Sequence, residues 1–202
     1  MNASGADQNN VNNNKGNLFV VSAPSGAGKS TLCRALRLAY PDIRYSISHT
    51  TREPRPGESN GVDYYFTTKA AFLMMRDQGQ LAEWAQVHGN YYGTSMKILD
   101  QALRNGWDIL LDIDVHGTQQ LLQRYPRVVT IFIMPPSLEI LRQRLQNRAT
   151  DDPETIDRRL HNAQKEIAQQ SIYRHVIVND DLERATNEFI QIVADYRQKR
   201  HT

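Results

Sequence analysis

The sequence predicts an α/β fold in which a central parallel β-sheet is flanked by helices on both faces. Apolar, strand-like runs alternate with segments of helical periodicity, and a glycine-bearing loop joins the first run to the first helix. A stretch of short strands and turns at about residues 46–97 further indicates an inserted, mixed α/β subdomain. The 202 residues, 40% of them hydrophobic, suffice for one domain with a sizeable core.

The amino-terminal part of the chain begins with a polar tail and continues into a strand and a helix. Residues 1–16 contain six Asn and few apolar residues, so we expect a disordered tail and order from about Asn17. Leu18–Ala23 is apolar except for Ser22, as a buried parallel strand would be. A helix should follow over Ser30–Tyr40 and end at Pro41.

The middle of the chain has a different pattern of secondary structure. Short alternating strands are predicted at Tyr45–Ser48, Asp63–Phe66 and Leu81–Val87, with one helix over Lys69–Asp77. Turn residues such as Pro54, Pro56, Gly57 and Asn60-Gly61 separate them. These features define the predicted subdomain.

The α/β alternation returns in the last half of the chain. A helix over Ser95–Asn105 should end at Gly106. Further strands are expected at Ile109–Ile113, Val128–Met134 and His175–Val178. Further helices are expected at Gly117–Arg124, Ser137–Asn147, Pro153–Tyr173 and Asp181–Arg197.

Composition limits the possible partners and compartments. A formal net charge of +2 gives no general reason to expect binding to nucleic acid or to a membrane surface. The single cysteine, Cys33, cannot form an internal disulfide and lies in an apolar helix pattern, so we expect it in the core. There is no membrane-spanning apolar stretch and no signal-peptide pattern, which favours a cytoplasmic protein.

The sharpest local motif lies between the first strand and the first helix. Ala23-Pro24-Ser25-Gly26-Ala27-Gly28-Lys29-Ser30 matches the phosphate-loop consensus G-x-x-x-x-G-K-[S/T] except at its first position. The glycines let backbone N–H groups turn inward, and the helix adds its positive amino-terminal end. Lys29 would reach the β- and γ-phosphates of a nucleotide, and the Ser30 hydroxyl would be a ligand of Mg²⁺.

An acidic strand end supports this interpretation. The apolar run Ile109–Leu111 ends in Asp112, which could hold Mg²⁺ directly or through water, and Asp114 follows two residues later. If the strand continued, both carboxylates would lie on one side of it. Taken alone, either aspartate could equally be a cap of the next helix.

A second anion-binding segment lies in the predicted subdomain. Arg52 and Arg55 are three residues apart around a proline turn, and two guanidinium groups on a stiffened loop could clamp one phosphate. Hydroxyl-bearing residues follow in Gly61–Tyr65 and Gly89–Thr94, with Glu83 and Trp84 between them.

Together these segments closely resemble the guanylate kinases. The resemblance covers about residues 17–197. It rests on Ser22–Ser30, Ser48–Arg52 with Pro54-Arg55 and Gly57-Glu58, Gly61 with Asp63-Tyr64, Glu83–Ala85, Asn90–Gly93, Leu111–Asp114, Pro135–Ser137 and Val176–Asp180.

The resemblance implies a phosphate-loop kinase with two mobile parts. The core would comprise about residues 17–45, 98–136 and 160–197, with a GMP-binding subdomain at 46–97 and a helical lid at 137–159. The implied reaction transfers a phosphoryl group from Mg²⁺-bound ATP to GMP or dGMP, within purine nucleotide metabolism and GMP recycling. The acceptor is a phosphate anion already, so no general base is required.

The same resemblance implies roles for individual residues. The ATP-binding loop would consist of Ala23, Pro24, Ser25, Gly26, Ala27, Gly28, Lys29, Ser30 and Thr31. The GMP phosphate would be held by Arg52, Arg55, Tyr64 and Tyr92, and the guanine read by Ser48, Glu83, Thr94 and Asp114. The lid would supply Arg144, Arg148 and Arg159, which with Lys29 and Arg52 form the implied catalytic set. His49 matches no implied role, and the oligomeric state does not follow from the sequence.

Two other functions remain open at this point. One is a phosphate-loop kinase with a different acceptor, and the other is a binding module that has kept the acceptor pocket without catalysis. The paired arginines and the base-facing acids argue against the first, and the intact phosphate loop argues against the second.

Overall fold

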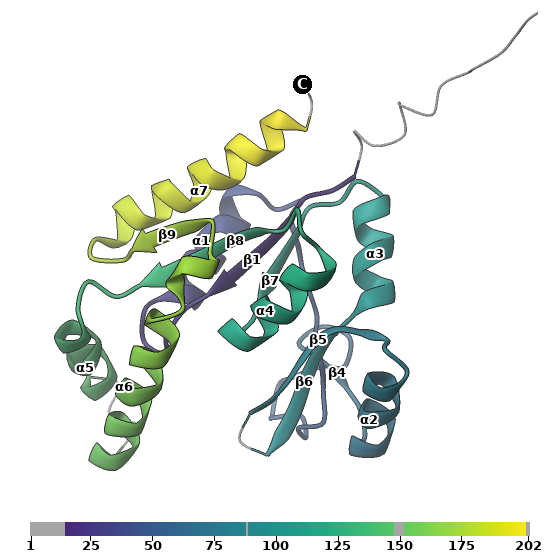
Figure 1. The fold of residues 1–202 in the computed structure, drawn as a ribbon, viewed down its shortest axis with the longest axis horizontal. Helices are drawn as coiled ribbons and strands as arrows, with labels where there is room; N and C mark the ends of the chain where they lie inside the picture. Colours follow the sequence, from purple (N-terminus) through teal and green to yellow (C-terminus); the bar gives the residue numbers. More distant parts are fainter. Residues whose placement is uncertain (1–14, 88, 148–151, 201–202) are drawn as a thin grey trace, which may run out of the picture.

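A five-stranded parallel sheet forms the centre of the molecule (Figure 1). The computed structural model describes residues 15–87, 89–147 and 152–200. The strand order is β2-β7-β1-β8-β9, and every pairing is parallel, as predicted. The strands are β1 (Leu18–Ser22), β2 (Arg44–Tyr45), β7 (Ile109–Asp112), β8 (Val129–Met134) and β9 (His175–Val178).

Helices cover both faces of this sheet because side chains along each strand alternate. On β1, Phe19 and Val21 pack in one core with helices α1 (Lys29–Ala39) and α7 (Leu182–Lys199). Leu18 and Val20 pack on the other face, against α3 (Met96–Arg104) and α4 (Val115–Arg124). Cys33 lies in the first of these cores, where burial raises the pKa of its thiol to about 12, so it is a packing residue as predicted.

A second, mixed sheet of four strands lies between α1 and α3 in the sequence. Its order is β4-β3-β6-β5, with β3 and β4 parallel and the other pairs antiparallel. Helix α2 (Lys69–Asp77) accompanies it. The strands are β3 (His49–Thr50), β4 (Tyr65–Phe66), β5 (Leu81–Val87) and β6 (Asn90–Ser95).

One predicted strand here was wrong and one strand was missed. The expected strand Tyr45–Ser48 does not form: only Tyr45 lies in a strand, β2, because the chain leaves the central sheet after Tyr45 and joins the second sheet at His49, where β3 begins. Strand β6 was not expected, since Gly89–Thr94 reads as turn residues. Gly93 fits in the strand because a side chain there would meet the Glu83 carbonyl oxygen at 2.9 Å.

Helices α5 (Leu138–Gln146) and α6 (Pro153–Ile167) form a hairpin with its own apolar cluster. The predicted single helix over Pro153–Tyr173 is wrong at its end, because α6 stops at Ile167 and a short 3₁₀ turn, η1 (Gln170–Ile172), follows. Figure 1 places this hairpin and the second sheet on the same side of the central sheet, whereas α7 ends on the opposite side.

The chain is anchored slightly earlier than predicted. The Gly16 backbone N–H donates to the Leu103 carbonyl at 2.9 Å, and the Asn17 N–H donates to Asp108 Oδ1 at 2.7 Å. Residues 1–14 of the predicted tail lie outside the described residues. None of the described helices has the length and apolar character needed to span a membrane.

Candidate functional site

The phosphate loop turns sharply between β1 and α1. Gly26 and Gly28 both have positive φ, 97° and 100°, a conformation that favours glycine. Gly28 is the N-cap of α1, and no side chain caps this helix. The first-turn N–H groups and the helix macrodipole are therefore available to an anion at the carboxyl end of β1.

Asn179 holds this loop in place from the end of β9. Its Nδ2 donates to the Ala27 carbonyl at 2.7 Å, and the side chain is buried. A Cβ at position 28 would lie 2.2 Å from Asn179 Nδ2, so the contact itself requires glycine there. The loop is thus fixed by a residue about 150 positions away in the sequence.

Lys29 at the start of α1 and Asp112 at the end of β7 form an ion pair. Their side chains are 23% and 18% exposed, so both are accessible to a ligand from solvent. The Tyr45 hydroxyl donates to the other Asp112 oxygen at 3.1 Å. Burial and the Asp112 charge raise the pKa of Tyr45, so its phenol stays protonated and continues to donate.

The residues at this strand end fit a hydrated Mg²⁺ better than a fully protein-bound metal. Ser30 is exposed on the first turn of α1, and its hydroxyl and the Asp112 carboxylate are hard oxygen donors. Over the described ranges there is no cluster of three or more His, Cys, Asp or Glu side chains that could hold a metal. Mg²⁺ commonly keeps several waters and binds substrate phosphates alongside one or two protein oxygens.

A cluster of cationic and phenolic groups lies on the second sheet. Arg52 is 15% exposed, and its guanidinium carbon lies 5.3 Å from the centre of the Tyr64 ring. The rings of Tyr64 and Tyr92 are 6.0 Å apart and meet edge to face. The structure thus brings together three of the four residues expected to hold the acceptor phosphate.

Glu58 fixes the arginine-bearing loop. One of its carboxylate oxygens accepts from Arg52 Nη2 and the other from the Arg55 backbone N–H, both at 2.8 Å. The Arg55 side chain is exposed. Only the Arg52 guanidinium is therefore held in position.

A buried carboxylate faces the carboxyl end of the central sheet from β5. Glu83 is 4% exposed, and the Thr94 hydroxyl donates to its Oε1 at 2.6 Å. Gly117 on α4 permits this approach, since a Cβ there would lie 2.8 Å from Glu83 Oε2. Burial, with a smaller contribution from the charge of Asp114, raises the pKa of Glu83 to about 7.

Of the other residues expected to read the base, Thr94 and Asp114 lie near Glu83. The condition for placing Asp112 and Asp114 on one side of a strand is not met, because β7 ends at Asp112. Asp114 instead caps α4, which is the alternative that the sequence also allowed, with Oδ1 accepting from the Gly117 N–H at 2.7 Å. Ser48 is half-buried just before β3, and its carbonyl accepts from the Tyr65 N–H at 2.9 Å. His49 stacks on the Tyr65 ring at 4.9 Å between centroids.

The lid arginines are only partly described. Arg144 Nη2 donates to the Asn179 carbonyl at 2.9 Å, which joins α5 to the residue that holds the phosphate loop. A Cβ at Gly26 would meet Leu141 and Leu145 at 3.0 and 3.1 Å, so α5 packs directly on that loop. Arg159 lies half-buried on α6. Arg148 lies outside the described residues.

The sequence did not predict roles for Tyr45, Asn179 or Glu166. Glu166 near the end of α6 is near enough to Asp114 and Lys29 for their charges to affect it, and burial raises its pKa to about 7. Asn179 and its neighbours belong to a segment that resembles the guanylate kinases, but the resemblance implied no role for it. Tyr45 and Asn179 bond to Asp112 and Ala27, which are distant in sequence, so no local motif reveals these contacts.

The parallel sheet, the glycine-bearing loop at its carboxyl edge and the Lys29–Asp112 pair define a phosphate-loop nucleotide-binding protein of the kinase type. The family model described as guanylate kinase matches residues 15–196. The chain therefore belongs to the guanylate kinase family.

Individual relatives agree with this assignment. The guanylate kinase of Syntrophotalea carbinolica is 53% identical over 178 residues, covering 88% of this chain and 85% of that protein. The guanylate kinase of Geobacter metallireducens is 48% identical over 183 residues, covering 91% and 90%. The crystal structure of guanylate kinase from Anaplasma phagocytophilum matches with a TM-score of 0.69 at 35% identity, covering 91% of this chain and 87% of that one.

Proposed function

We propose that the chain transfers the γ-phosphoryl group of ATP, bound with Mg²⁺, to GMP or dGMP, which yields ADP and GDP or dGDP. Family membership supports the reaction class. The observation that carries the choice of acceptor is the buried Glu83 carboxylate held by Thr94 on the second sheet.

The donor nucleotide would bind at the phosphate loop, residues 23–31. Backbone N–H groups and the end of α1 would face the β- and γ-phosphates, and Lys29 would leave Asp112 to contact the transferring group. Ser30 and Asp112 would hold Mg²⁺, which when bound neutralises charge that develops on the phosphates. Arg144 and Arg159 on the helical hairpin, together with Arg148, would add positive charge from the other side.

The acceptor would bind on the second sheet. Arg52 with Tyr64 and Tyr92 forms a compact donor cluster for the GMP phosphate, and Arg55 is free to swing toward it from the exposed loop. On binding, the Arg52 guanidinium would either leave Glu58 for the GMP phosphate or contact both groups at once. No general base is needed, because the acceptor oxygen is anionic near neutral pH.

Guanine selection would follow from hydrogen-bond complementarity. Guanine presents N1–H and an exocyclic amine side by side, and an ionised carboxylate accepts both. Adenine has a lone pair at N1, which would face the carboxylate and leave it unpaired in a buried site. Glu83 and Asp114 supply the carboxylates, while Ser48 and Thr94 add hydroxyl groups.

A coupled assay of ADP release with GMP, AMP, CMP and UMP tests this proposal. Recognition through buried polar groups predicts kcat/KM for GMP roughly 10⁴-fold above the others. The Lys29→Ala variant should lose turnover by about 10² or more while it keeps GMP affinity. Equal rates on several nucleotides would contradict the acceptor, and full activity of Lys29→Ala would contradict the donor site.

A further inference from the structure

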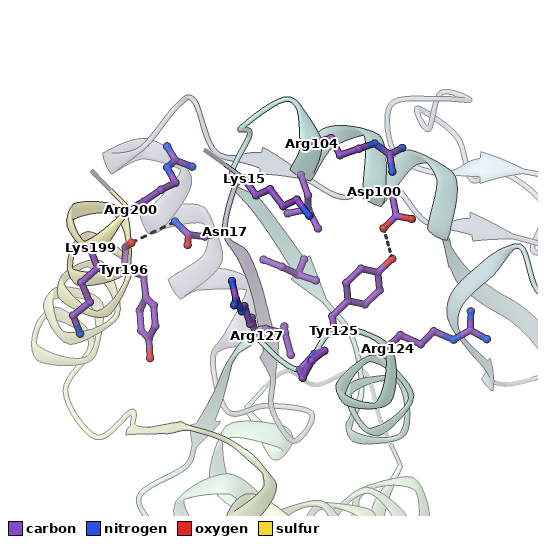
Figure 2. Close-up of a pocket in the computed structure, with 15 residues that line it drawn as sticks. Lys15, Asn17, Asp100, Arg104, Arg124, Tyr125, Arg127, Tyr196, Lys199 and Arg200 are labelled. Atoms are coloured by element: carbon purple, nitrogen blue, oxygen red, sulfur yellow. Dashed lines mark hydrogen bonds between the residues drawn. The ribbon is translucent and has the colours of Figure 1, made fainter. Parts of the chain in front are cut away.

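A second hollow lies at the opposite edge of the central sheet from the phosphate loop (Figure 2). Its volume is about 710 Å³, within the range of small-molecule sites. Asn17 and Leu18 at the start of β1 line it, as does Val128 immediately before β8. The phosphate loop follows the other end of β1, so the five residues of that strand separate the two sites.

The lining of this pocket is strongly positive. It contains six cationic side chains and one carboxylate, Asp100, so it carries more positive charge than the +2 of the whole chain. The cations are Lys15, Arg104, Arg124, Arg127, Lys199 and Arg200. In Figure 2 they come from α3, α4, α7 and the segments that precede β1 and β8.

Most of these cations lack a carboxylate partner among the described residues. Arg200 is paired with Asp108 at 2.7 Å, Lys199 lies over the Tyr196 ring, and Arg124 Nη1 donates to Met96 Sδ at 3.3 Å. The single lining carboxylate, Asp100, accepts a hydrogen bond from the Tyr125 hydroxyl at 2.8 Å. Within residues 15–87, 89–147 and 152–200, no ion pair involves Lys15, Arg104 or Arg127.

Helix stability alone does not account for this arrangement. Basic residues in the last turn of a helix complement its macrodipole, which suffices for Arg104 and Arg124 at the ends of α3 and α4. Lys15 and Arg127 lie outside any helix. Gathering like charges around one hollow is unfavourable unless an anion joins them.

We propose that this pocket binds a small polyanion that carries two or more phosphate groups. Several separated cations match several phosphates better than a single carboxylate, and Leu18, Leu103 and Val128 give the pocket an apolar floor. The pocket is distinct from the proposed substrate sites, so a ligand here would be a regulator or a stabilising ion. Because α4 also supplies Asp114 and Gly117, a ligand at its carboxyl end contacts the same helix that borders Glu83.

Calorimetric titration of the full chain with sodium tripolyphosphate tests the proposal. We expect a binding event that remains in Lys29→Ala, so that it is distinct from the phosphate loop, and whose affinity falls as NaCl is raised. The triple variant Lys15→Ala, Arg104→Ala, Arg127→Ala should weaken binding by at least about tenfold while kinase activity and melting temperature stay unchanged. The matched control, Arg34→Ala, Lys97→Ala, Lys165→Ala, removes the same charge from other exposed positions and should bind as the parent does.

Three outcomes would overturn the proposal. Equal weakening in both triple variants would indicate attraction to net charge only. If Lys29→Ala abolished all binding while the pocket triple variant still bound as the parent does, the anion would be assigned to the phosphate loop. If a single-stranded RNA bound much more tightly than tripolyphosphate, the ligand of this pocket would be a nucleic acid and not a small polyanion. Arg127→Glu alone should also weaken binding by about tenfold, which covers the case in which the triple variant does not fold.

Discussion

Glu83 is the residue whose surroundings most strongly shape the proposed chemistry. Its carboxyl group is nearly inaccessible, touches Thr94 and α4, and has a pKa of about 7 because burial disfavours its charge. A bound guanine would supply the two hydrogen-bond donors that the carboxylate lacks. The ionised Glu83 carboxylate therefore destabilises the free protein, and hydrogen bonds from a bound guanine would offset this cost.

Replacing Glu83 by Gln should lower selectivity for GMP. An amide cannot accept both guanine protons, so we expect the ratio of kcat/KM for GMP over AMP to fall by about 10² or more. The KM for ATP should barely change, since the phosphate loop lies on other elements. Coupled assays with both acceptors measure this, and Glu188→Gln on the exposed face of α7 is the control. A ratio equal to that of the parent would leave specificity to Asp114 and the hydroxyl groups.

The same carboxyl group should make the stability of the free protein depend on pH. The pKa of Glu83 is about 7 in the folded state against 4.5 as the reference value, so ionisation destabilises the fold as pH rises through this window. Its penalty is absent below pH 4.5 and complete above pH 7, on the order of 3 kcal/mol. Urea unfolding without nucleotides should show Glu83→Gln to be more stable than the parent at pH 8.5, by a smaller margin at pH 5.5, and nearly equal to it at pH 4.

Exposed Glu154→Gln serves as the control for that experiment and should follow the parent at every pH. Glu166, whose pKa burial also raises to about 7, will leave a residual slope in the Glu83 variant. A parent protein that is as stable at pH 8.5 as at pH 5.5 would contradict the raised pKa of both groups.

At the scale of elements, the phosphate loop is defined by the contact between the start of α1 and the segment after β9. Asn179 holds the Ala27 carbonyl, and its own carbonyl accepts from Arg144 of α5. One residue thus connects the loop that would hold ATP to the hairpin that would close over it.

Gly28→Ala should disturb the contact between the phosphate loop and Asn179 in two ways. Alanine is strained at the positive φ of position 28, and its Cβ would clash with the Asn179 side chain. We expect destabilisation of more than about 2 kcal/mol in urea unfolding. Gly57→Ala is a matched control, since Gly57 also has positive φ, 89°, but no atom lies within 4 Å of its added Cβ.

Adding Asn179→Ala to Gly28→Ala should recover part of the loss, because it removes the clashing amide but not the backbone strain. Fully additive effects of the two substitutions would show that the close approach of Asn179 is not what requires glycine at position 28.

For the whole molecule, the important feature is that two projecting parts lie on the same side of the central sheet (Figure 1). The α5–α6 hairpin has its own core of Leu141, Leu145, Ile156, Leu160 and Ala163. The second sheet carries the Arg52 and Glu83 clusters. We therefore expect each part to move as a unit against the central sheet.

We expect both parts to close only when both substrates are bound. Small-angle scattering should show a smaller radius of gyration with GMP plus an inert ATP analogue than with either alone, since closure excludes water from the phosphates. Ala substitution of Arg144 and Arg159 should reduce this compaction. Identical dimensions in all four states would contradict closure.

Much of the fold follows from local patterns. Strand β9, helix α2 and strand β5 lie at their predicted bounds, and the parallel central sheet is confirmed, because alternating or continuous apolar runs between turn residues specify such elements locally. The change from the central sheet at Tyr45 to the second sheet at His49 was missed, and so was β6. Both depend on which distant strand pairs with the segment, and the two-residue strands β2 and β3 have no periodicity of their own.

The sequence by itself determined the family and the position of the phosphate loop with Lys29, and it predicted the acceptor arginines, because these motifs depend on residues close together in the chain. Only the tertiary structure decided that Thr94 and Gly117 hold Glu83 in a buried position, that Asn179 fixes the phosphate loop, and that cations from α3, α4 and α7 surround one pocket. The physical reason is that burial and electrostatic proximity are set by contacts between elements far apart in sequence, and no local pattern encodes those contacts.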